Sequence, residues 1–173
     1  MLMESHIEYM VAGSVASSFH GEPRSTRDID LVIVARPAAI DRLLSTIDRD
    51  RFYVPDRGAR DAAAHGGQFN IVDTSTGWKF DLMVRRDRPF SESEFSRRVF
   101  DSVLGVDVWI ATREDTILAK LDWSRDSLSE RQFADVVSML RVGRSELDEE
   151  YLDRWANELG VIDALQAARA AAE

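Results

Sequence analysis

The segment that decides the fold runs from Gly13 to Ile33 and reads GSVASSFHGEPRSTRDIDLVI. It follows a short apolar run, Tyr9–Ala12, which we expect to be a strand. Gly13 and Ser14 then precede a stretch that we expect to be a short helix. A glycine lets the backbone come close to a ligand, and the first amides of a helix are unpaired and attract anions. By itself, this pattern is a weak indication of a phosphate site.

Two acids near the end of the segment strengthen that indication. Asp28 and Asp30 are two residues apart, so they share one face of a strand. The run after Asp30 is continuously apolar, as is typical of a buried central strand. Two carboxylates at the mouth of such a strand repel each other unless a cation lies between them.

A third acid, Asp81, interrupts another apolar strand, residues 79–84. Three strand-borne carboxylates that converge on one edge of a sheet can hold two magnesium ions, or manganese in their place. Such ions activate an attacking hydroxyl and neutralise charge on a transferring phosphoryl group. The sequence therefore predicts Asp28, Asp30 and Asp81 as metal ligands and catalytic residues.

The order of patterns along the chain predicts an α/β (α+β) fold with a mixed sheet. Strands are expected at 9–12, 29–34, 69–73, 79–84 and 106–111, with a helix at 37–47 and a hairpin turn at 73–77. From Thr112 onward the pattern is helical, and Thr112 and Ser129 begin capping-box-like helix starts. A third helix is expected from about Asp148, followed by an alanine-rich helical end. We therefore divide the chain into residues 1–112 and a helical subdomain at 113–173.

Composition restricts the function classes. The chain has 173 residues, of which 45% are hydrophobic and 31% charged, as in a globular protein. It has no cysteine, which excludes disulfides and thiolate zinc sites. No apolar run is long enough for a membrane helix, and no signal segment is visible, so a cytoplasmic protein without membrane contact is expected. The four tryptophans occur in apolar periodic contexts and are expected in the core.

The formal net charge of −9 argues against general nucleic-acid binding, since phosphate contacts dominate that affinity. A local basic cluster follows the third acid and would either receive an RNA acceptor or be merely solvated. Its members are Arg85, Arg86, Arg88, Arg97 and Arg98.

The motif set resembles that of the polymerase-beta-like nucleotidyltransferase superfamily. Gly13-Ser14 is followed by thirteen residues, then by an Asp-apolar-Asp-apolar motif, and later by an acid within an apolar strand. The resemblance implies the mixed-sheet nucleotidyltransferase fold with flanking helices. It also implies that Gly13 and Ser14 hold the terminal phosphates of a nucleotide, and that Asp81 helps to activate the acceptor hydroxyl.

A narrower resemblance links the helical part to AbiEii-type bacterial nucleotidyltransferases, which would suggest a toxin–antitoxin role. It rests on the segments Glu114–Leu121 and Ser129–Val136. It implies that Lys120 contacts a nucleotide phosphate and that Asp135 belongs to the nucleotide site. Arg131 departs from the group's pattern, because it lies four residues before Asp135 instead of next to it.

Three further cations are candidates for the nucleotide site. Arg24 and Arg27 lie in the loop before Asp28 and would steer a triphosphate, unless they are only solvated. Lys79 shares a strand face with Asp81, so it would either reach phosphate or pair with that acid.

The predicted function is magnesium-dependent transfer of a nucleoside monophosphate from a nucleoside triphosphate to a hydroxyl acceptor, which would be tRNA, a protein or a small molecule. Two alternatives stay open. One is a non-catalytic nucleotide-binding or antitoxin-like module of the same fold, and the other is an aminoglycoside-type small-molecule nucleotidyltransferase.

Overall fold

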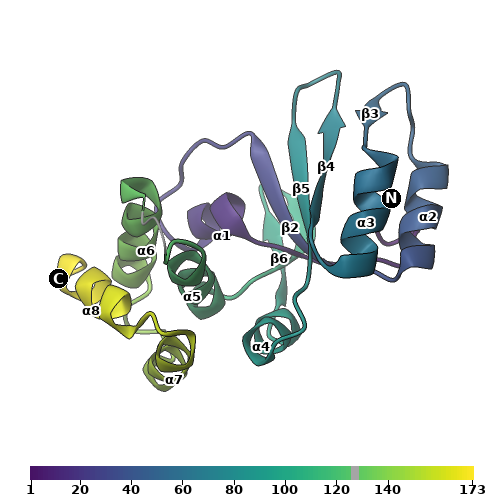
Figure 1. Ribbon diagram of the computed structural model, residues 1–173. Coiled ribbons are helices and arrows are strands. Elements are labelled where there is room, and N and C mark those ends of the chain that lie inside the picture. Colours follow the sequence, from purple (N-terminus) through teal and green to yellow (C-terminus); the bar gives the residue numbers. More distant parts are fainter. Residues whose placement is uncertain (126–128) are drawn as a thin grey trace.

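The computed structural model describes residues 1–125 and 129–173, which form one mixed sheet and eight helices (Figure 1). The sheet has the order β3-β4-β5-β2-β1-β7-β6. Its strands are β1 (Glu8–Val11), β2 (Asp28–Val34), β3 (Phe52–Tyr53), β4 (Gln68–Asp73), β5 (Lys79–Val84), β6 (Val99–Val103) and β7 (Val106–Ile110). The predicted α/β class with a mixed sheet is confirmed.

Strand β2 lies in the middle of the sheet, as its apolar run predicted. It pairs antiparallel with β1 and parallel with β5. The predicted hairpin joins β4 to β5. Helices α2 (Pro37–Thr46) and α3 (Asp56–His65) pack against one face of the sheet through a shared apolar core. In Figure 1, α1 (Gly13–His20) lies between the strands and helices of the C-terminal part, and its Ala16 belongs to the same apolar core.

The helical part forms a second apolar core. It consists of α5 (Arg113–Trp123), α6 (Glu130–Val142), α7 (Glu149–Leu159) and α8 (Ile162–Ala171). The side chains of Thr112, Ser129 and Asp148 cap α5, α6 and α7. Helix α4 (Pro89–Ser96) contributes Phe90 to this core, and α1 contacts both α5 and α6. Helices α1 and α4, which precede the helical part in the chain, therefore join it to the sheet.

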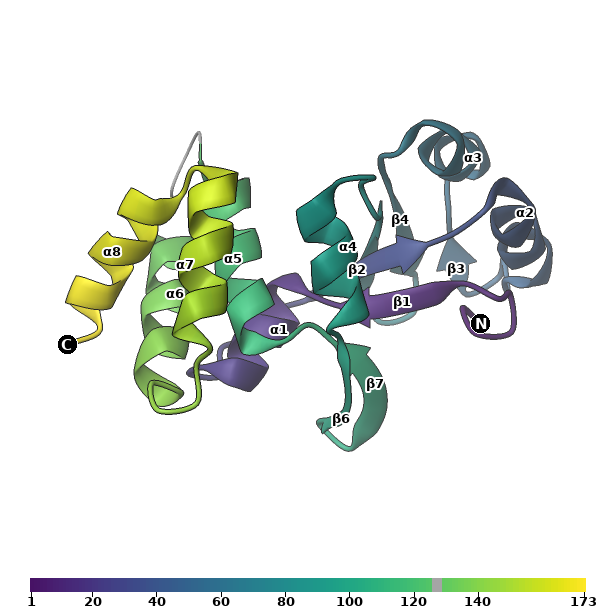
Figure 2. The same ribbon diagram turned by 90° about the horizontal axis from the view of Figure 1, so that it is seen from below.

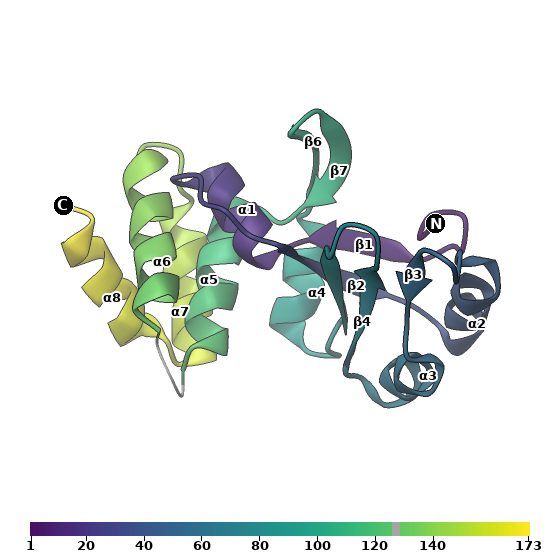
Figure 3. The same cartoon turned by 90° about the horizontal axis from the view of Figure 1, so that it is seen from above.

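Several elements carry too little pattern to be predicted. The buried face of α3 is made of small residues, Ala59 and Ala62, so no large apolar stripe marks it. Strand β6 is the exposed edge of the sheet, and with β7 it curves away from the body (Figures 2 and 3). Within the described ranges, no helix combines the length and the apolar character needed to cross a bilayer.

The expectation that all four tryptophans lie in the core is wrong. Trp155 is buried, but Trp78, Trp109 and Trp123 are 40%, 37% and 55% exposed. A tryptophan can recur at a helical or strand period whether its ring lies in the core, on a cleft wall or on an outer face. Periodicity alone therefore does not place such a residue.

Candidate functional site

The three predicted acids lie on adjacent strands. The parallel register of β2 and β5 pairs Asp30 with Asp81 and Asp28 with Lys79. The ammonium of Lys79 lies 2.9 Å from an Asp81 carboxylate oxygen and 3.4 Å from one of Asp28. The hydrogen bond to Asp81 is the main cause that raises the pKa of Lys79. A positive charge thus already lies between two of the acids.

Asp30 faces the Gly13–Ser14 turn. The Ser14 amide donates to the Asp30 carboxylate at 3.3 Å. Burial raises the pKa of Asp30, and the neighbouring Asp81 and Asp28 charges raise it further, while the Ser14 amide opposes the shift. A half-buried carboxylate beside two other acids gains from a cation.

Gly13 is required by this contact. Its φ is +56°, and a Cβ atom at this position would lie 1.9 Å from an Asp30 carboxylate oxygen. The sequence pattern suggested that the glycine makes room for phosphate. In the structure, the nearest neighbour that excludes a side chain is the carboxylate of Asp30.

The donor set fits magnesium. Carboxylate oxygens are hard ligands of the kind magnesium prefers. In the part of the chain that the structure describes, no three acidic or histidine side chains already stand in a metal-binding arrangement. In this arrangement Lys79 contacts Asp28 and Asp81, and Asp30 contacts the Ser14 amide.

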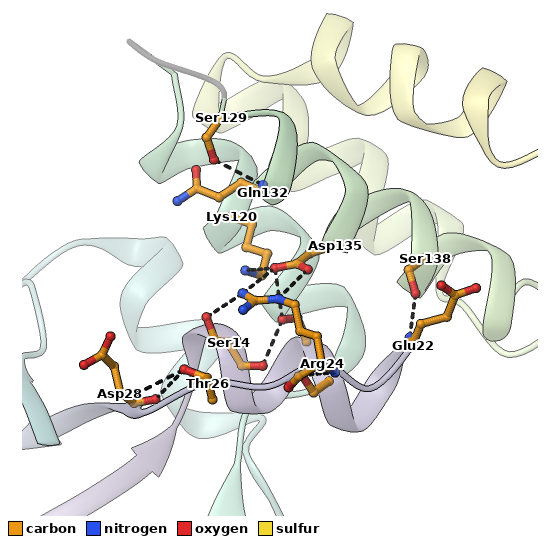
Figure 4. A network of polar contacts seen from close by, with 12 residues as sticks. Ser14, Glu22, Arg24, Thr26, Asp28, Lys120, Ser129, Gln132, Asp135 and Ser138 are labelled. Atoms are coloured by element: carbon orange, nitrogen blue, oxygen red, sulfur yellow. Dashed lines mark hydrogen bonds and ion pairs between the residues drawn. The ribbon is translucent and has the colours of Figure 1, made fainter. Parts of the chain in front are cut away.

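Asp135 on α6 contacts two of the predicted phosphate-binding cations, Arg24 from the loop before β2 and Lys120 from α5 (Figure 4). Its carboxylate accepts hydrogen bonds from Lys120 Nζ at 2.8 Å and from two Arg24 nitrogens at 2.9 and 3.0 Å. Arg24 also donates to Ser14 Oγ at 2.7 Å. Burial alone would raise the pKa of Asp135, but the hydrogen bonds and charges of Arg24 and Lys120 lower it below its ordinary value.

The two cations that contact Asp135 are both residues that the sequence placed at the nucleotide site. Asp135 fixes Arg24 and Lys120 beside Ser14 and links α6, α5 and α1. The structure thus brings Ser14, Arg24, Lys120 and Asp135 together, whereas Arg27 lies exposed in the loop before β2.

A cleft of about 830 Å³ lies between the sheet and the helices. Of the predicted residues, Gly13, Ser14, Asp30, Asp81 and Lys120 line it. Asp28, Lys79, Arg24 and Asp135 lie behind or beside these lining residues, in contact with at least one of the predicted acids or cations. Apart from Arg27, the predicted residues therefore lie at or beside one cleft.

The basic cluster is mostly engaged in ion pairs. Arg88 pairs with Asp122 at 2.6 Å and Arg97 with Asp115 at 3.2 Å. The other two pairs are Arg85 with Glu92 at 3.6 Å and Arg98 with Glu8 at 2.8 Å. Arg86 instead stacks over the exposed ring of Trp123, 5.0 Å from its centroid. The cluster is therefore not a free basic wall.

Sequence reasoning missed two cleft residues, Glu94 on α4 and Trp123 at the end of α5. Glu94 is only 7% exposed. Its local sequence, Ser-Glu-Ser-Glu, is typical of a solvated surface, so no signal in the sequence marks it as buried. The contrast between exposed Trp123 and buried Trp155 likewise appears only in the fold.

No protein-family model and no curated protein matches this chain. Among solved structures, it is similar to an antigenic nucleotidyltransferase-like protein from Paracoccidioides brasiliensis, with 20% identity, a TM-score of 0.56, and coverage of 98% of this chain and 87% of that one. A second match is the antibiotic-resistance factor ANT(2'')-Ia, with 13% identity, a TM-score of 0.38, and coverage of 98% and 86%. The first likeness establishes a nucleotidyltransferase-like fold. The AbiEii-type resemblance stays a prediction.

Proposed function

We propose that this protein is a magnesium-dependent nucleotidyltransferase that moves a nucleoside monophosphate from a nucleoside triphosphate to a hydroxyl acceptor. The observation that carries the proposal is the register of β2 and β5, which sets Asp30 beside Asp81 while Asp30 faces the Gly13–Ser14 turn. Two of the acids and the Gly13–Ser14 turn thus line the same cleft. The nucleotidyltransferase-like fold supports the same activity.

The triphosphate would bind at the Gly13–Ser14 turn. Ser14 offers a hydroxyl beside the start of α1, and a helix start favours an anion. Arg24 donates to Ser14 Oγ, and Lys120 lies on the cleft wall. Asp135 keeps both cations in place, so their positions are set before the nucleotide arrives. Preorganised cations of this kind stabilise a leaving pyrophosphate.

Asp28, Asp30 and Asp81 would hold the metal. The chemistry that bound magnesium supplies there is neutralisation of phosphate charge and activation of the attacking oxygen. The Asp81 carboxylate takes the proton of the acceptor hydroxyl. The acceptor oxygen then bonds to the α-phosphorus as the bond to pyrophosphate breaks, and Lys120 and Arg24 stabilise the negative charge that leaves.

Lys79 has a separate role in the free protein. Its ammonium neutralises Asp28 and Asp81, which reduces repulsion among the acids. The flexible stem of a lysine allows the ammonium to swing away when a divalent cation takes its place. Lys79 can then reach a phosphate oxygen of the bound nucleotide.

The test separates transfer from binding. The protein is incubated with magnesium and each α-labelled triphosphate, together with tRNA, protein or small-molecule acceptor pools, and the labelled product is identified. Asp30→Asn and Asp81→Asn should both abolish labelling, whereas Asp107→Asn, on exposed β7, should leave it unchanged. Labelling that persists in Asp30→Asn would refute the proposed metal site.

A nucleotide-binding module without catalysis is the second candidate. The observation that favours it is the Lys79 bridge, which occupies the space between Asp28 and Asp81. Magnesium-dependent triphosphate binding with no labelled product from any acceptor pool would support this candidate.

A further inference from the structure

The hairpin formed by β6 and β7 (residues 99–110) presents apolar side chains to solvent. It curves away from the body of the molecule (Figures 2 and 3). Five of its large apolar residues are at least 37% exposed, namely Val99, Phe100, Leu104, Val106 and Trp109. The rings of Phe100 and Trp109 lie opposite each other across the two strands, with their centroids 5.2 Å apart. An exposed apolar patch of this kind marks an interaction surface.

Leu104, at the tip of the hairpin, does not suit its own turn. Leu104 and Gly105 are the two residues between the paired Val103 and Val106, and their φ angles are +52° and +80°. A two-residue turn with two positive φ angles favours asparagine before glycine, and a bulky side chain at positive φ is costly. Burial within one chain does not offset that cost, because Leu104 is 99% exposed. A contact outside the single chain explains a leucine at this place.

A groove of about 340 Å³ beside the base of the hairpin matches this tip. Its apolar lining includes Met3, Ile7 and Trp109. A dry cavity of about 150 Å³ holds a benzene molecule, so the groove has room for a leucine side chain. His6 also lines the groove, and in the part of the chain that the structure describes His6 and Leu104 are the two non-glycine residues with positive φ. Unusual backbone therefore occurs at both the tip and the groove, as is typical of functional contacts.

We propose that two copies of this chain form a symmetric dimer in which Leu104 of each copy enters the groove of the other. The occupant is a second copy because the tip and the groove belong to the same chain. Five-residue strands span about 17 Å, so antiparallel packing of the two hairpins sets each tip at the other's base. A two-fold rotation makes both contacts at once, and the assembly closes with two chains.

The charges on the hairpin favour the same antiparallel arrangement. Arg98 lies at the base, with its guanidinium 5.1 Å from the centroid of the Trp109 ring, and it also pairs with the exposed Glu8. Asp107 lies toward the tip on the strand face that carries Trp109, because the two are two residues apart. Antiparallel packing brings Asp107 of each copy to Arg98 of the other, whereas parallel packing would set like charges together. Opposite charges across an interface fix its orientation.

The first test measures the mass of the full chain by light scattering from micromolar to millimolar concentration. We expect twice the mass of one chain at the upper end. Leu104→Asp should raise the dissociation constant of the dimer at least about tenfold, as for a central interface residue. Leu104→Asn should do the same without lowering the melting temperature of the monomer, because asparagine suits the turn. Val142→Asn, which changes a 57% exposed residue of α6, should leave the dimer unchanged.

The second test joins the tip of one copy to the groove of another. The chain has no cysteine, so Leu104→Cys and Met3→Cys each introduce a single thiol. Mild oxidation of an equimolar mixture, with one variant tagged, should give a disulfide-linked pair that contains both variants. Val142→Cys mixed with Met3→Cys is the matched control and should give much less of the mixed pair.

Three results would overturn the inference. The first is a chain that stays monomeric over the whole concentration range. The second is a dimer that both Leu104→Asp and Leu104→Asn leave intact, and the third is a mixed disulfide as abundant with Val142→Cys as with Leu104→Cys. None of residues 99–110 lines the cleft, so these outcomes do not bear on the proposed function.

Discussion

Replacement of Asp135 by asparagine should destabilise the protein strongly, because this carboxylate is the shared partner of two cations. Lys120 and Asp135 are each 9% exposed at the side chain, and their charged atoms are 2.8 Å apart. Removing one partner of a buried ion pair costs about 3–5 kcal/mol, since the other charge is left uncompensated. Arg24 is 27% exposed at its side chain and recovers some hydration, so it adds little to this cost. We expect a loss of about 3 kcal/mol for Asp135→Asn.

The assay is urea unfolding, followed across pH. The pKa of Asp135 is lowered in the folded protein, so its contribution is present above its unfolded pKa of about 3.9 and is lost as pH falls through the folded pKa. The difference between wild type and Asp135→Asn should therefore be full at pH 7 and shrink below about pH 4. Glu130→Gln, on the exposed start of α6, serves as a control for general effects of charge on this helix. A loss below about 1 kcal/mol at pH 7, or a difference that does not change with pH, would refute the reasoning.

Three other predictions concern the acids and their neighbours. Gly13→Ala should lower the free energy of unfolding in urea by more than about 2 kcal/mol, because its Cβ would collide with Asp30 and its φ is positive. The double variant with Asp30→Ala should recover part of this loss, and strictly additive losses would contradict the clash. Asp30→Asn should be more stable than wild type at pH 7, because the pKa of Asp30 is raised in the folded protein and its charged form costs stability above that pKa. In thermal unfolding the advantage should vanish below about pH 4. A variant that is less stable at pH 7 would disprove this. Lys79→Met should bind magnesium alone several-fold more tightly in a calorimetric titration, because the lysine ammonium no longer competes with the ion for the Asp28 and Asp81 carboxylates. Weaker binding would show that Lys79 is not a competitor.

The predictions made from the sequence succeeded where local pattern carries the information. The apolar run after Asp30 predicted the central strand, and the thirteen-residue spacing from Ser14 predicted a nucleotidyltransferase-like fold. Capping residues such as Thr112 and Ser129 predicted helix starts, because a side-chain oxygen that accepts from the third helical residue is a local contact. The role of Lys120 in nucleotide binding and the division at residue 112 stay predictions.

The sequence by itself determined which residues are chemically able to act: three strand-borne acids, a Gly–Ser turn and a few cations. Only the tertiary structure decided what each of them contacts. Asp135 lies 111 residues from Arg24 in the chain, so their ion pair leaves no periodic trace in either segment. The local sequence around Glu94 predicts a surface acid, because it indicates a helix but not which elements pack against that helix. Partners that meet across the fold are set by the packing of helices against the sheet, and burial and charge balance follow from that packing.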